Sequence, residues 1–174
     1  FYSDVDSASL ERFLYRLENN VLESNFMIAS KSGSTFETKD GFLRVLQMLK
    51  DAYTAQGKSA EEADKAAHKH FIAVTDANAE KSELRRTSIE KGWLGDLFIH
   101  DDVGGRFSAF DDHALFTLAY AGMKKEDMIS MLNAAQEVSS ESLTADLSVN
   151  DALKEGIFWA EAKMNGISAS VHQY

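Results

Sequence analysis

Residues 30–38 read SKSGSTFET, and the first six of them hold four hydroxyl side chains and one glycine. The preceding residues 25–29, NFMIA, have the length and apolar character of a short buried strand. Apolar residues then recur at helical spacing from about residue 37 to residue 55. The stretch is therefore a strand-to-helix turn rich in short hydrogen-bond donors, and such turns commonly bind anions.

The same strand-then-helix order recurs along the rest of the chain. Apolar runs predict further strands at 70–75, 96–100 and 167–172. Helical patterns fall before the first strand, from residue 59, through residues 84–89, and at about 109–121, 125–139 and 149–164. Repeated strand–helix units with apolar strands predict an α/β fold with a doubly wound, mainly parallel sheet and helices on both faces. No linker or repeat divides the sequence, so we expect a single domain over residues 1–174.

The composition limits the class of protein. The chain has 174 residues, of which 44% are hydrophobic and 26% are charged, as in globular proteins rather than disordered ones. Its formal net charge of −10 argues against contact with nucleic acid or an anionic membrane. No apolar run reaches the length of a membrane span, and cysteine is absent. We expect a cytoplasmic location, because a chain without cysteine fits a reducing compartment.

Two loops with unusual chemistry follow predicted strands, SKSGST at residues 30–35 and DDVGGRFS at residues 101–108. Ligands of open α/β sheets bind beyond the carboxyl ends of the strands, where these loops lie. In the first loop, hydroxyls and helix-start amides offer many donors to a phosphate, and Gly33 lets the backbone approach closely. The alternative is a capped turn, in which serine and threonine satisfy only the start of the helix.

The second loop pairs two glycines with an arginine. Gly104 and Gly105 allow tight backbone conformations that expose amides to a ligand. Arg106 keeps its charge and binds planar pairs of oxygen atoms in fork geometry. The alternative is an arginine that pairs with Asp101 or Asp102 in a structural turn. Whether the two loops are neighbours depends on strand order, which the sequence does not predict.

Other candidate groups have weaker support. Glu37 lies in the first turn after the first loop, where an acid also favours the start of a helix. His100 precedes two aspartates and could shuttle a proton, although it also fits the exposed end of a strand. His68 and His70 lie two residues apart with no third ligand evident, so we expect no metal site.

Two segments in this order, ASKSGSTFET at 29–38 and DDVGGRFS at 101–108, carry a resemblance that spans nearly the whole chain. The intervening HFIAVTD and the final SASVHQY look like strands of the same family in the same order. The chain resembles the sugar isomerase (SIS) domain of the phosphoglucose isomerase (glucose-6-phosphate isomerase) family. The resemblance implies a flavodoxin-like domain with a five-stranded sheet. Because the sequence starts at Phe1 and not at methionine, we expect an internal fragment of a longer chain.

The resemblance also implies roles for residues of both loops. Arg106 matches the arginine that stabilises the anionic enediolate during proton transfer between sugar carbons 1 and 2. Gly104 and Gly105 match the adjoining substrate-binding backbone. Ser30, Ser32 and Thr35 match the positions that hold the substrate phosphate. Lys31, Gly33 and Ser34 complete this phosphate-binding loop.

The implied activity is the isomerisation of glucose 6-phosphate to fructose 6-phosphate, without a metal or organic cofactor, in a cytoplasmic homodimer. The family's GIGGS loop, the glutamate base of its ESxGK segment, a histidine and a late lysine have no counterpart here. The isolated chain should therefore be inactive. Residues 110–113, FDDH, also replace the small apolar residues that usually follow the second loop. Two alternatives stay open: a non-catalytic sugar-phosphate-binding domain of a regulator, and one part of a bifunctional sugar-phosphate enzyme.

Overall fold

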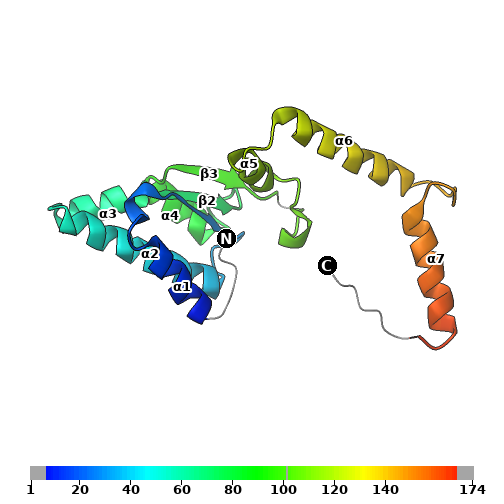
Figure 1. The fold of residues 1–174 in the computed structure, drawn as a ribbon, viewed down its shortest axis with the longest axis horizontal. Helices are drawn as coiled ribbons and strands as arrows, with labels where there is room; N and C mark the ends of the chain where they lie inside the picture. Colours follow the sequence, from blue (N-terminus) through cyan, green and yellow to red (C-terminus); the bar gives the residue numbers. More distant parts are fainter. Residues whose placement is uncertain (1–6, 101, 168–174) are drawn as a thin grey trace. The chain divides into compact units, whose positions relative to one another are not determined.

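The computed structural model describes residues 7–100 and 102–167 of the chain (Figure 1). The chain forms two compact units, residues 1–118 and residues 119–174. Within the described residues, the first unit contains a sheet with its helices and the second contains two further helices. The expected single domain over the whole chain stays a prediction.

The sheet has three parallel strands in the order β1–β2–β3 within the described residues. They are β1 Phe26–Ala29, β2 Phe71–Thr75 and β3 Gly95–Phe98. Phe26 pairs with Phe71 at the start of the β1–β2 ladder, and Thr75 pairs with Phe98 at the end of the β2–β3 ladder. Because all three strands run the same way, the loops that follow them leave from one edge of the sheet.

The strands alternate with helices along the chain (Figure 1). The helical segments of the first unit are α1 Ser7–Leu17, α2 Phe36–Ala55, α3 Ala60–His68, α4 Glu83–Lys91 and α5 Asp112–Tyr120, which ends at the start of the second unit, with the short 3-10 helices η1 Val21–Glu23 and η2 Gly105–Phe107. Both β–α–β crossovers run in the same direction across the sheet, so α2, α3 and α4 cover one face of it.

The prediction of an α/β fold with a parallel sheet flanked by helices is confirmed. The described residues contain three strands instead of the expected five. The strand expected at 167–172 lies outside the described residues except for Ile167. The strand expected at 96–100 is shifted, because it already pairs with β2 at Gly95 and the chain turns at His100.

Aromatic side chains form the centre of the core between the sheet and its helices. Phe71 of β2 is fully buried, and its ring centroid lies 5.0 Å from that of Phe42 and 5.2 Å from that of Trp93. Phe26 of β1 lies 5.7 Å from Phe71 on the same face, as their pairing in the ladder requires. Leu49 of α2 is also fully buried in this cluster. The cluster fixes α2 against β1 and β2, and with it the turn that precedes α2.

His68 ends α3 and lies buried against Trp93. The Trp93 Nε1–H group donates to His68 Nδ1 at 3.0 Å, so this nitrogen carries no proton and the ring is neutral. Burial lowers the pKa of His68 from its ordinary value of 6.5, because the charged ring would lose its hydration. The carboxylate of Asp64 opposes this shift, and Lys91 and Lys50 reinforce it.

We expect the free energy of unfolding to fall as the pH drops below about 6.5, since unfolded chains then bind a proton at His68 that the folded state resists. His68→Asn should weaken this pH dependence, because the amide oxygen still accepts from Trp93 and does not titrate. Urea unfolding at several pH values, followed by Trp93 fluorescence in a Trp159→Phe background, measures the effect. His100→Asn is the matched control at an exposed histidine. Equal pH profiles for both variants would contradict the assignment to His68.

The second unit contains α6 Lys125–Glu141 and α7 Asp151–Met164, close to the helices predicted at 125–139 and 149–164. Asn150 orders the turn before α7: its amide oxygen accepts from the Leu153 amide at 2.8 Å. Its amide nitrogen donates to the carbonyls of Ser142 and Thr144 at 3.1 and 2.6 Å. Among the helices of the described residues, none is long and apolar enough to cross a membrane.

Candidate functional site

The loop after β1 is anchored through its backbone carbonyls. The Thr75 hydroxyl and the Asp76 amide donate to the carbonyl of Lys31 at 2.9 and 3.1 Å. The Glu83 amide, at the start of α4, donates to the carbonyl of Ser32 at 2.9 Å. The course of the loop is therefore set by its main chain against the segment that follows β2, and its hydroxyls are not needed for this anchoring.

The hydroxyls of this loop form two pairs. The oxygens of Ser30 and Thr35 lie 3.0 Å apart, and Ser30 Oγ also accepts from the Gly33 amide at 3.1 Å. The oxygens of Ser32 and Ser34 lie 2.6 Å apart, and Ser32 Oγ accepts from the Ser34 amide at 3.2 Å. Ser30 is buried, whereas the other three hydroxyl residues are exposed. The hydroxyl residues expected to bind phosphate therefore lie together in one turn, most of them open to solvent.

The N-terminus of α2 has no side-chain cap. Thr35 is the N-cap residue, but its side chain makes no capping hydrogen bond. By contrast, Ser59 caps α3 in a capping box, and Ser82 caps α4 by accepting from the Arg85 amide. Thr35 forms no such bond, although Ser30 and Ser32 accept from amides of the preceding turn, so both the capped turn and the anion site stay predictions. The first amides of this 20-residue helix therefore remain available to an anion at the positive end of the helix dipole.

Gly33 fits against α4 where a larger residue would not. Its φ of 79° lies in the left-handed region that favours glycine. A Cβ atom at this position would lie only 2.5 Å from the backbone nitrogen of Leu84. The turn therefore requires glycine both for its backbone conformation and for the close approach of α4.

The loop after β3 lies beside the first loop. The Lys31 ammonium donates to the carbonyl of His100 at 3.0 Å and to the carbonyl of Val103 at 3.1 Å. These bonds join the donor-rich turn to the segment that leads into the two glycines. Lys31 was expected to complete the phosphate loop, and the structure places its ammonium on the second loop. The two loops therefore meet at the carboxyl edge of the sheet.

Arg106 is the middle residue of η2, which follows Gly104 and begins at Gly105. The side chain of Arg106 lies outside the described part of the structure, as does Asp101. Both the enediolate role of Arg106 and its alternative pairing with Asp101 or Asp102 therefore remain predictions. Gly104 and Gly105 are exposed, and their role as substrate-binding backbone stays a prediction.

Ser108 and His113 support the turn that carries Arg106. The buried Ser108 hydroxyl donates to the carbonyl of Gly105 at 2.7 Å. His113 Nε2 lies 3.2 Å from the same hydroxyl oxygen and donates to it, because the hydroxyl proton already points to Gly105. The FDDH segment, where the sequence departs from the family pattern, thus contributes a contact to the second loop.

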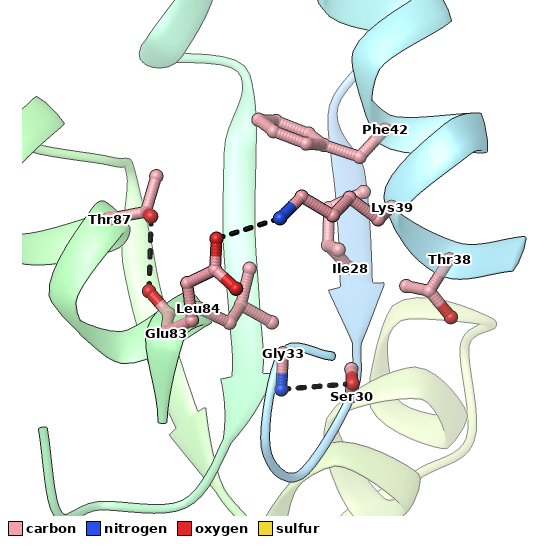
Figure 2. A pocket seen from close by; sticks show the side chains of 9 residues that line it. All are labelled: Ile28, Ser30, Gly33, Thr38, Lys39, Phe42, Glu83, Leu84 and Thr87. Atoms are coloured by element: carbon pink, nitrogen blue, oxygen red, sulfur yellow. Dashed lines mark hydrogen bonds and ion pairs between the residues drawn. The ribbon is translucent and has the colours of Figure 1, made fainter. Parts of the chain in front are cut away.

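A small cavity of about 40 Å³ lies between α2 and α4, beside Ser30 and Gly33 (Figure 2). Lys39 of α2 and Glu83 of α4 form an ion pair across it, with 2.8 Å between Nζ and Oε1. The hydrogen bond from Lys39 lowers the pKa of the Glu83 carboxyl. A sugar phosphate needs a site of several hundred Å³, so the candidate ligand site is the open turn rather than this cavity.

In the described residues, the side chains of the weaker candidates form no hydrogen bond or ion pair with either loop. Glu37 is exposed in the first turn of α2, and His100 is exposed after β3. His70, expected to have no role as a metal ligand, contacts the Tyr53 hydroxyl at 2.8 Å and the Ser24 carbonyl at 2.7 Å. In residues 7–100 and 102–167, no group of three or more His, Cys, Asp or Glu side chains is placed to hold a metal ion.

Thr75 and Ser82 belong to the site, although the sequence analysis did not single them out. Both are fully buried, and their hydroxyl oxygens lie 2.6 Å apart. Thr75 supports the first loop directly, and Ser82 caps the helix that Gly33 contacts. A polar residue at the carboxyl end of an apolar strand is the signal that could have identified Thr75.

The fold and the two joined loops define an open α/β protein whose candidate ligand site lies at the carboxyl edge of its sheet. The family model for phosphoglucose isomerase matches residues 1–161. The chain belongs to the phosphoglucose isomerase family.

Curated relatives named glucose-6-phosphate isomerase match most of this chain. The one from Rippkaea orientalis is 31% identical over 159 residues, which cover 91% of this chain and 27% of the relative. The one from Mycoplasmopsis pulmonis is 30% identical over 155 residues, which cover 89% of this chain and 32% of the relative. The crystal structure of a hypothetical protein from Thermus thermophilus aligns with a TM-score of 0.74 and 26% identity, over 93% of this chain and 34% of that one. The chain therefore spans about a third or less of each of these three proteins.

Proposed function

We propose that this chain supplies the phosphate loop and the oxyanion-stabilising arginine of a glucose-6-phosphate isomerase. The observation that carries the proposal is the Lys31 bridge, because it brings the donor-rich turn and the glycine–arginine turn to one edge of the sheet. Membership of the phosphoglucose isomerase family supports the same reaction. The activity is proposed for a protein of family length, of which this chain is one sugar isomerase domain.

In this proposal the substrate phosphate binds at the start of α2. Ser32, Ser34 and Thr35 turn exposed hydroxyls to it, and Ser30 holds Thr35 in place. Gly33 brings the backbone close, and the first amides of α2 add donors at the positive end of the helix. Several short donors suit a phosphate, which has several acceptor oxygens.

The chemical step is a proton transfer between carbons 1 and 2 of the open sugar. Removing a proton beside a carbonyl builds negative charge on oxygen in the enediolate. A fixed cation aimed at that oxygen lowers the barrier, which is the role proposed for Arg106 beside Gly104 and Gly105. The reaction then needs a base and an oxyanion site, and we propose that it proceeds without a metal or organic cofactor.

The base is proposed to lie outside this chain, so the isolated chain should bind the sugar phosphate without turnover. Glu37 and His100 are exposed, so neither is enclosed with a substrate in the described residues. We further propose a cytoplasmic homodimer for the protein of family length. A non-catalytic sensing domain of a regulator would share the phosphate loop. In that case a protein of family length that contains this chain would show no turnover.

Ser32→Ala and Thr35→Val should each weaken the binding of glucose 6-phosphate to this chain. Hydrogen bonds to a charged group contribute about 1–3 kcal/mol each, so each variant should raise the dissociation constant roughly fivefold or more. Titration of the ¹⁵N-labelled chain with glucose 6-phosphate, followed by NMR, gives the dissociation constant. The residues whose amide signals shift locate the binding site, which we expect at residues 30–38.

Thr54→Val is the matched control, since Thr54 lies at the opposite end of α2 and its hydroxyl donates to the Lys50 carbonyl of the same helix. Its affinity for glucose 6-phosphate should equal that of the original chain. If Ser32→Ala and Thr35→Val bound the sugar phosphate as well as this control does, the proposed phosphate loop would be wrong.

A further inference from the structure

We propose that Lys31 is a positioning residue, which holds the glycine–arginine turn beside the phosphate loop and does not itself bind the phosphate. The inference rests on the proposed function, because it assigns a task within the same site. It separates two roles that the loop could combine. The hydroxyls and amides bind the phosphate, and Lys31 sets where the second loop meets the rest of the sugar.

The first argument is the distance that Lys31 spans. β1 and β3 are separated by β2, so the loops that follow them start two strand spacings apart, roughly 10 Å. The backbone of Lys31 rests on the end of β2, because Thr75 and Asp76 donate to its carbonyl. From there its ammonium reaches two carbonyls of the loop after β3.

The second argument is the chemistry of these contacts. An ammonium group is a donor, and a pair of neutral carbonyl oxygens at 3.0 and 3.1 Å uses it as a structural tie. His100 and Val103 are themselves joined, since the Val103 amide donates to the His100 carbonyl at 3.1 Å. Lys31 therefore closes a compact turn immediately before Gly104.

The third argument is that the far side of this segment is held separately. Ser108 donates to the Gly105 carbonyl and contacts His113, both within the same unit. The glycine–arginine turn is thus fixed at its end by Ser108 and at its beginning by Lys31. Removing Lys31 releases the side that faces the phosphate loop and leaves the Ser108 contact intact.

The test compares two ligands on the same chain, inorganic phosphate and glucose 6-phosphate. Lys31→Met should change the affinity for inorganic phosphate much less than the affinity for glucose 6-phosphate, because the hydroxyls and helix amides remain. It should weaken the binding of glucose 6-phosphate about tenfold, an effect comparable with the loss of one hydrogen bond to a charged group. Lys31→Arg should restore most of that affinity, since a guanidinium can also donate to two carbonyls. NMR titration of each variant measures both affinities.

A double-mutant cycle with Arg106→Ala sharpens the test. If Lys31 acts by placing the turn of Arg106, the two substitutions should be non-additive for kcat/KM with glucose 6-phosphate in a protein of family length, and the double variant should turn over like Arg106→Ala alone. Lys58→Met is the control for the lost charge, because Lys58 follows α2 at its opposite end, roughly 30 Å from the first loop. It should leave both affinities unchanged.

Three results would overturn the inference. They are an equal loss of affinity for both ligands in Lys31→Met, fully additive effects of Lys31→Met and Arg106→Ala, and no recovery of glucose 6-phosphate affinity in Lys31→Arg. If the original chain bound neither ligand, the proposed function would fail instead. The positioning role of Lys31 would then be judged by amide hydrogen exchange without ligand. Lys31→Met should speed exchange at the amides of Phe107 and Ser108, which donate to Gly104 and Gly105, and unchanged exchange there would refute it.

Discussion

Gly33→Ala should both destabilise the first unit and abolish phosphate binding at the loop. Alanine at a φ of 79° costs about 1–2 kcal/mol, because its Cβ crowds the neighbouring carbonyl oxygen. The same Cβ would lie 2.5 Å from the Leu84 nitrogen, and relieving this overlap costs about 1–3 kcal/mol more. Since α4 cannot yield without disturbing the Ser32 anchor, the loop must move away from the start of α2.

The chain contains a matched control for this substitution. Gly57 also has a positive φ, 90°, but a Cβ there would meet nothing within 4 Å. Gly57→Ala should therefore lose stability only through its backbone conformation and should bind phosphate normally. Urea unfolding and phosphate titration of both variants measure the difference, and equal destabilisation by the two would show that the Leu84 contact has no consequence.

Arg106→Ala has the largest expected effect on catalysis. In a protein of family length that contains this chain, it should reduce kcat on the order of 100- to 1000-fold, as removal of one oxyanion-stabilising group typically does. Affinity for inorganic phosphate should survive, because the proposed phosphate site lies on the other loop. Steady-state isomerisation assays with glucose 6-phosphate, in both directions, measure the change.

Arg44→Ala is the comparison for this experiment. Arg44 is an exposed arginine of α2 that pairs with Asp40 at 2.9 Å, so its loss removes the same charge far from the second loop. Turnover that is unchanged by Arg106→Ala would exclude the enediolate role. A protein of family length without measurable turnover would instead favour the sensing domain of a regulator.

The turn between β1 and α2 could be predicted because the spacing of apolar residues changes there. A short continuous apolar run is followed by apolar residues at helical spacing. The helix expected from residue 59 likewise begins there, with a capping box formed by Ser59 and Glu62. These features depend on residues close together in the sequence. The donor-rich turn was therefore located from sequence.

The meeting of the two loops could not be predicted. Lys31 lies 69 residues from His100 and 72 from Val103, and only the strand order brings them together. The same applies to Thr75, whose support of Lys31 depends on the position of β2 between its neighbours. Local patterns also could not show that Thr35 would pair with Ser30 instead of capping α2.

The anchoring of residues 30–35 through main-chain carbonyls has a consequence for protein engineering. Because Thr75, Asp76 and Glu83 hydrogen-bond to the backbone, we expect the exposed hydroxyls to tolerate exchange for small polar groups that still accept from the Ser34 amide. A library that varies Ser32 and Ser34 while keeping Gly33 would sample new selectivities, such as sulfate or carboxylate, on an unchanged scaffold.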